Sequence, residues 1–273
     1  MSRSGKAMDE TSYWYLHPID HPLCASVLER GMVEGKRFAC EKGQTKHLNP
    51  THHNLQTMWP NSIIEINANT PIEKYVFFDE IPHDSPFIEP ENILIISTQH
   101  HITPYPVLQI HDALLPSSSC DAFRQLQQRL FEPTDFAQPD DRLGGYFVAI
   151  EDLTEMILRI IKFNIPIQQS FHVSGRRYWE WQTLIDEFLM LYRRTVAGRT
   201  GEFKHQHLAI QTLDHVSVKP IEQITNHPQR INLAPFHDLL KHHTGEGWRP
   251  ITPMRVSLMS LIQYMLLEGL LEE

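Results

Sequence analysis

The sequence predicts an α+β fold, with a β-rich N-terminal part over residues 1–113 and a mostly α-helical C-terminal part over residues 114–273. Short runs of β-branched and aromatic residues, separated by prolines, fill the first part, and this pattern is typical of strands and turns. Apolar residues spaced three and four apart fill the second part, as in amphipathic helices. A chain of 273 residues is long enough for either two domains or one continuous domain, so both arrangements stay open.

Each expected strand of the first part is a short apolar run. The runs occupy residues 62–66, 75–78, 92–97 and 107–110, and their lengths suit strands. Prolines lie between them, and a proline cannot donate a hydrogen bond to a neighbouring strand. We therefore expect turns between the runs and some strands at the edges of a sheet.

The second part contains three well-marked amphipathic or apolar segments. Residues 150–161 and 177–196 repeat apolar side chains with the period of a helix. Residues 254–271 are apolar on nearly every side, so a helix there must be covered on every side. Between them, residues 203–213 alternate like a strand and place His205 and His207 on one face.

Composition restricts the class of protein. Hydrophobic residues make up 41% and charged residues 21% of the chain, which is typical of a folded globular protein. The formal net charge of −9 disfavours a nucleic-acid partner, because such binding depends on basic side chains that neutralise phosphates. The apolar segment near the C-terminus is interrupted by Gln263 and Glu268 and is too short to cross a membrane.

Three cysteines stand far apart, at Cys24, Cys40 and Cys120. An odd number without regular spacing argues against a disulfide framework. The first residues also lack the apolar stretch of a secretory signal. The sequence therefore predicts a reducing, cytoplasmic compartment, and delivery into the cytosol of another cell stays open.

Histidine is the most unusual feature of the composition, with 17 residues in 273. The sequence shows no phosphate loop, nucleophile elbow, zinc-protease helix, paired CxxC or dinucleotide fingerprint. His205 and His207 are the metal candidates, because residues i and i+2 of a strand point the same way and can offer two imidazoles to one divalent transition metal. The alternative is a surface strand with two solvated histidines.

A second candidate site lies on the predicted helix near residue 240. Asp238 and His242 stand four residues apart, so their side chains are neighbours on one helix face. The pair is either a general base with its orienting carboxylate or a simple hydrogen bond on the helix surface.

The C-terminal helix and the histidines lead to three functional hypotheses. The first is a non-enzymatic interaction protein, an adaptor, assembly subunit or delivered effector, whose protein partner or second copy covers an apolar helix through Leu258, Leu261, Ile262, Met265 and Leu266. The second is a metal-dependent hydrolase or oxygenase that uses the histidine-rich site to activate water. The third is a pH-responsive switch, since histidines change charge between about pH 7 and pH 5.

Overall fold

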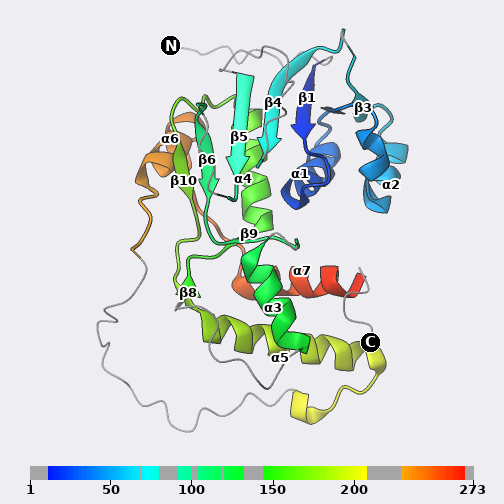
Figure 1. The fold of residues 1–273 in the computed structure, drawn as a ribbon, viewed down its shortest axis with the longest axis vertical. Helices are drawn as coiled ribbons and strands as arrows, with labels where there is room; N and C mark the ends of the chain where they lie inside the picture. The colour runs from blue at the N-terminus through cyan, green and yellow to red at the C-terminus, as the bar shows by residue number, and fades with distance from the viewer. Residues whose placement is uncertain are drawn as a thin grey trace. The chain divides into compact units, whose positions relative to one another are not determined.

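The computed structural model describes residues 12–67, 69–79, 92–99, 104–117, 120–131, 144–207 and 229–267. The chain forms two compact units, each assembled from three segments of sequence (Figure 1). The first unit contains Met1–His111, Ile150–Val173 and Asn232–Arg249, and the second contains Asp112–Ala149, Ser174–Ile231 and Pro250–Glu273. The division of the chain into residues 1–113 and 114–273, which the sequence suggests, stays a prediction.

The first unit is built on a seven-stranded sheet in the order β10-β6-β5-β4-β1-β2-β3. Every pairing in this sheet is parallel. The strands are β1 (Tyr13–His17), β2 (Phe38–Cys40), β3 (Ile63–Glu65), β4 (Ile72–Phe78), β5 (Ile93–Ser97), β6 (Val107–Ile110) and β10 (Phe171–Val173). The helices of this unit are α1 (Pro22–Val33), η1 (Gln44–His47), α2 (Pro50–Met58), α4 (Ile150–Lys162) and α6 (Ala234–Thr244).

The predicted α+β division is wrong, because helices and parallel strands alternate from the start of the chain. Helices α1 and α2 lie within the part that was expected to be β-rich, and β10 lies within the part that was expected to be mainly helical. Parallel strands need crossover connections, and a sheet of this kind is buried on both faces. The continuous apolar runs of β5 and β6 are therefore interior parallel strands.

Helices α1 and α4 pack together in the first unit. Gly31 allows α1 to lie close to the sheet, since a Cβ atom at this position would overlap the ring of Phe38. The hydroxyl groups of Thr154 of α4 and Ser26 of α1 share a hydrogen bond of 2.8 Å. The buried side chains of α4 include Leu153, Met156, Ile157, Leu158, Ile160 and Ile161, so this predicted helix is confirmed.

A cluster of aromatic and aliphatic side chains lies on the sheet, with members from β1, β4, β5 and β6. Tyr15, Phe77, Ile95 and Val107 form one buried apolar cluster. The rings of Tyr15 and Tyr75 lie 5.5 Å apart, and those of Tyr15 and His17 are stacked at 6.3 Å. His17 therefore ends β1 as the last member of a row of rings.

The second unit is mainly helical. It contains α3 (Asp121–Phe131), α5 (Trp181–Thr200), the short helix η3 (His205–His207) and α7 (Met254–Leu267). Two small sheets complete it: β7 (Ala113–Leu114) pairs with β9 (Val148–Ala149) in parallel, and β8 (Gly144–Gly145) pairs with β11 (Trp179–Glu180) in antiparallel fashion. Its core contains Phe123, Leu126, Leu184 and Phe188.

The apolar C-terminal helix is α7, and it packs against α5. Leu258, Leu261, Ile262 and Met265 are buried in the core of the second unit, and Leu266 packs against that core. Four of the five side chains assigned to an interaction surface are thus covered by their own chain. Among the residues that the structure describes, no helix is long and apolar enough to span a membrane.

Candidate functional site

The carboxyl edge of the seven-stranded sheet is the candidate functional site. β1 pairs with β2 on one side and with β4 on the other, so the strand order reverses between β1 and β4. In open parallel sheets, ligands bind outside the carboxyl ends of the strands at such a switch point. Several strands end there in polar side chains, or are followed directly by them: Glu41, His17, Asp79, Ser97 and His111.

Asp79 is the centre of a hydrogen-bond network at this edge. Ser97 Oγ donates to its Oδ1 at 3.1 Å and Thr98 N donates to the same oxygen at 2.6 Å. Thr98 Oγ1 donates to Oδ2 at 2.7 Å, and His21 Nε2 lies 3.1 Å from Oδ2. The network joins the loop after β1, the end of β4 and the end of β5.

These contacts determine the protonation of Asp79. Burial alone raises the pKa of the Asp79 carboxyl, but the hydrogen bonds from His21 and Thr98 outweigh burial and lower the pKa to about 2. The carboxylate is therefore charged at neutral pH, and donors surround both of its oxygens. Its backbone has a φ of 59°, a conformation that Asp and Asn tolerate better than most residues.

Both ring nitrogens of His21 are engaged. His21 caps the start of α1, where its Nδ1 accepts a hydrogen bond from Leu23 N at 3.2 Å. Nδ1 must therefore carry no proton, and Nε2 carries the proton that it donates to Asp79. With neither nitrogen available to a substrate, His21 is a bridging group rather than a general base.

A second group of polar side chains lies between β1 and β2. His17 Nδ1 is 3.7 Å from Glu41 Oε2, and Gln44 Nε2 lies 3.4 Å from the same ring nitrogen. Gln44 Oε1 is buried and has no hydrogen-bond partner among the described residues. The side chain of Glu41 is 54% exposed and that of His17 only 12%, so Glu41 presents a carboxylate to solvent beside a shielded imidazole.

The loop after β2 is held by Glu65 of β3. Its carboxylate accepts hydrogen bonds from Thr45 Oγ1 at 2.7 Å and from Gly43 N at 2.9 Å. Both hydrogen bonds lower the pKa of the Glu65 carboxyl, and the one from Thr45 has the larger effect. This anchor positions the segment that carries Gln44.

Two histidines meet at the other end of the edge. His111 follows β6, His172 belongs to β10, and His111 Nε2 lies 2.9 Å from His172 Nδ1. One of these nitrogens must carry a proton and the other must accept it. Between this pair and Asp79, Gln109 Nε2 donates to the carbonyl oxygens of Ser97 and Gln99.

The structure does not support the transition metal that was predicted at His205 and His207. The two residues lie in the short helix η3 rather than on a strand, so they do not share a face with a period of two. His207 Nδ1 already accepts a hydrogen bond from Lys204 N at 2.8 Å. No group of three or more potential metal-ligating side chains occurs among the described residues. The remainder of the predicted strand, residues 208–213, lies outside the described residues.

Asp238 and His242 lie on α6 as expected, and both are on its accessible side. The ring of His242 packs edge-on against His243 at 5.1 Å. Their assignment as an acid and base pair stays a prediction.

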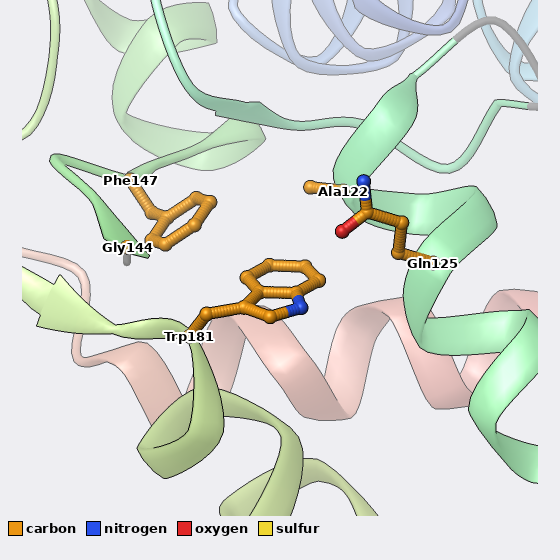
Figure 2. A pocket seen from close by; sticks show the side chains of 5 residues that line it. All are labelled: Ala122, Gln125, Gly144, Phe147 and Trp181. Atoms are coloured by element: carbon orange, nitrogen blue, oxygen red, sulfur yellow. The ribbon is translucent and has the colours of Figure 1, made fainter. Parts of the chain in front are cut away.

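The second unit contains a small hollow lined by Ala122, Gln125, Gly144, Phe147 and Trp181 (Figure 2). It has room for about one water molecule. Figure 2 shows the indole nitrogen of Trp181 on the side of α3, the helix that carries Ala122 and Gln125. This nitrogen is buried without a hydrogen-bond partner in the described part of the chain, and a single water is the ligand that the space admits.

Sequence reasoning missed the network around Asp79. The signal was present, because Asp79 directly follows the buried Phe78 and Ser97 directly follows the buried Ile96. A polar residue after each of two buried strands is typical of the carboxyl edge of a parallel sheet. These polar residues could not be grouped from the sequence, because the pairing and direction of the expected strands were unknown.

The sequence matches no protein-family model and no curated protein. Solved structures match over nearly the whole chain. The Bordetella bronchiseptica enzyme WbmG in complex with NAD has a TM-score of 0.54 at 10% identity, covering 97% of each chain. The yeast methylglyoxal/isovaleraldehyde reductase Gre2 complexed with NADPH has a TM-score of 0.52 at 11% identity, covering 94% of this chain and 99% of the reductase.

A third match, the dTDP-glucose 4,6-dehydratase of Bacillus anthracis in complex with NAD, has a TM-score of 0.51 at 9% identity and covers 96% of this chain and 98% of the dehydratase. This chain has a Rossmann-like fold. Identities near 10% establish the fold alone. The predictions of a non-enzymatic interaction protein and of its metal-dependent alternative are not supported: the matching solved structures are of reductases and a dehydratase, and the described residues hold no group of three or more metal-ligating side chains.

Proposed function

We propose that this chain is an enzyme that binds a nucleoside or a similar sugar-containing molecule at the carboxyl edge of β1, β2 and β4. The observation that carries the proposal is the position of Glu41 directly after β2, beside His17 and Gln44. The fold supports it, because parallel sheets of this order bind ligands at the reversal of strand order. The matched structures with NAD and NADPH come from enzymes that carry out reductions and a dehydration of a sugar nucleotide.

Glu41 is the candidate ribose-binding residue. In dinucleotide-binding sheets, an acidic side chain about 20 residues after the first βα turn accepts hydrogen bonds from ribose hydroxyls. Glu41 stands 20 residues after His21 in that turn. Its carboxylate is more than half exposed, so it is accessible to the two neighbouring hydroxyls of a sugar.

His17 is the candidate proton-transfer group of this site. A general base needs a second group that orients its ring, and Glu41 and Gln44 both lie near its Nδ1. Stacking on Tyr15 fixes the plane of the ring. We assign His17 to proton transfer and Glu41 to ligand binding and ring orientation.

NAD and NADP do not fit the turn between β1 and α1 in the way that this fold usually holds them. That mode needs glycines that let the backbone approach the pyrophosphate, and free N–H groups at the helix start. Residues 17–24 contain no glycine, and Pro22 is the first residue of α1. No step of the proposed function passes through a nicotinamide cofactor.

The proposal is tested by calorimetric titration of the full-length chain with adenosine and with uridine. Replacing Glu41 by Gln removes the charge but keeps the shape, and we expect it to weaken binding about tenfold or more, since a hydrogen bond to a charged group contributes about 1.5 to 3 kcal/mol. Glu202→Gln is the matched control, because Glu202 is exposed in the other unit. Equal affinity of the Glu41 variant and wild type would refute the assignment.

Two further expectations belong to this proposal. A formal net charge of −9 disfavours nucleic acid as the ligand, because phosphate contacts need clustered basic groups. All three cysteines are free thiols, and Cys24 and Cys40 are buried. We therefore propose a reducing compartment, which mass measurement of the thiol content of protein isolated from its native cells would test.

A further inference from the structure

We propose that the bridge between His21 and Asp79 closes the phosphate end of the site, so that the ligand of this chain carries no pyrophosphate. The inference deepens the proposed function and takes the nucleoside class of ligand from it. It concerns the turn of residues 17–24, which links β1 to α1.

The turn offers few of the groups that would hold a phosphate. A phosphate at a helix start is bound by backbone N–H groups that point out of the first turn. Pro18 and Pro22 have no N–H to offer, and the N–H of Leu23 is already donated to His21 Nδ1. The start of a helix carries a partial positive charge that favours a bound anion. Asp20 is exposed one residue before the cap of α1, so its carboxylate already supplies a negative charge near this helix start.

The capping imidazole is itself held in place from the sheet. Its Nε2 donates to Asp79, and its ring stacks on Phe78 at 5.4 Å between ring centres. The side chains of His21 and Asp79 are each only 12% exposed. Rotating His21 away would leave Leu23 N and Asp79 Oδ2 without these partners, and an unsatisfied buried polar group is costly.

Charge also opposes a phosphate at this point. Hydrogen bonds from His21 and from the side chain and backbone of Thr98 hold Asp79 in its charged form. A second anion beside a carboxylate that is only 12% exposed is repelled, because partly buried charges are screened less than exposed ones. Asp79 thus places an anion beside the residue that caps α1, the helix start at which this fold usually holds a pyrophosphate.

The other end of the site stays suited to a neutral sugar. Glu41 is exposed, and Gln44 Oε1 is buried without a partner among the described residues. A carboxylate and an amide oxygen accept hydrogen bonds from hydroxyl or amino groups. This half of the site therefore selects for the nucleoside part of a ligand and the turn selects against the phosphate part.

The test compares adenosine with molecules in which adenosine is joined through a pyrophosphate to a second sugar. Adenosine, ADP-ribose, NAD⁺ and NADP⁺ are titrated into the full-length wild-type protein by calorimetry. We expect adenosine to bind about tenfold or more tightly than the three pyrophosphates. Binding of NAD⁺ or ADP-ribose as tight as that of adenosine, or tighter, would overturn the inference.

A second measurement keeps the inference testable if no nucleoside binds. Nitrogen-15 NMR of the histidine rings reports which nitrogen carries the proton, and a His21→Gln variant assigns the His21 signals. We expect the Nε2–H form of His21, unchanged by an excess of NAD⁺. A shift of these signals on adding NAD⁺ would overturn the closed turn. An unchanged spectrum without any nucleoside binding would support the closed turn and refute the proposed function.

Discussion

His21 Nε2 lies 3.1 Å from Asp79 Oδ2. This contact connects the turn between β1 and α1 to the end of β4, the central strand of the sheet. His21 is the residue that caps α1, and Asp79 follows β4 directly. The pair therefore fixes the start of a helix to the neighbouring strand at the reversal of strand order.

Replacing Asp79 by Asn should destabilise the protein by about 1.5 to 3 kcal/mol, because hydrogen bonds to a charged group are lost or weakened. Asn is chosen because it also tolerates the φ of 59° at this position. Urea unfolding at pH 7 measures the change. Asp238→Asn, on the accessible side of α6, should change the free energy of unfolding by less than about 0.5 kcal/mol.

The contribution of Asp79 should depend on pH in a defined window. Its pKa in the folded chain is lowered to about 2 from an ordinary value of 3.8, so its stabilisation is complete above about pH 4 and disappears as pH falls through 2. The shift corresponds to about 2 kcal/mol. The difference in unfolding free energy between wild type and Asp79→Asn should shrink from pH 5 to pH 2, and a constant difference would contradict the assigned charge.

His52 should make the protein less stable in mild acid. It is 2% exposed, its Nδ1 accepts from Asn49 N, and its Nε2 lies 3.2 Å from the carbonyl oxygen of Ala25. Burial lowers the pKa of His52, and the nearby Ala25 carbonyl and Glu29 only partly offset this. The folded state therefore prefers the neutral ring, and its stabilisation is complete above the ordinary pKa of about 6.5 and falls at lower pH.

The measurement is urea unfolding of wild type and His52→Gln at pH 7.5 and pH 5.5. The loss of stability between these pH values should be smaller in the variant by about 1 kcal/mol. His53→Gln, at the exposed neighbouring position, should keep the wild-type loss. If both variants behave alike, His52 is not the group responsible.

Gly31→Ala should destabilise the first unit by about 1 to 3 kcal/mol, since the new methyl group overlaps the ring of Phe38. A methyl group at Gly198 of α5 would instead meet open space. Gly198→Ala should therefore stabilise the chain by about 0.5 to 1 kcal/mol through helix propensity. Thermal unfolding of the two variants should show shifts of opposite sign.

Leu258→Ala should cost about 2 to 5 kcal/mol, because the side chain is fully buried in the second unit. Met259, its neighbour in α7, is 52% exposed, and Met259→Ala should change stability by less than about 0.5 kcal/mol. Urea unfolding distinguishes them. A loss of less than about 0.5 kcal/mol at Leu258 would contradict its burial in this core.

Individual segments could be predicted from the sequence, since their local patterns are strong. The runs expected at residues 92–97 and 107–110 are β5 (Ile93–Ser97) and β6 (Val107–Ile110). The helices expected at residues 150–161 and 177–196 are α4 (Ile150–Lys162) and α5 (Trp181–Thr200). Periodicity identified these segments without information from the rest of the fold.

The arrangement of the segments could not be predicted, because its signals are weak in this chain. α1 begins with a histidine cap and contains Gly31, and neither feature is typical of a helix start or interior. α2 does begin with an Asn cap, but it has no apolar stripe, since its buried residue is His52. Without these two helices, the first strands look like one β-rich part, and the shared edge of Asp79 and Ser97 could not be inferred.

The first unit is completed only by residues 232–249, which follow segments of the second unit in the sequence. Chains are made from the N-terminus at about 5 to 20 residues per second, and domains fold as units. During synthesis the earlier strands of the first unit are therefore exposed for seconds before α6 is made. Neither unit corresponds to a continuous gene fragment, so expression of either one alone requires rejoining separated segments.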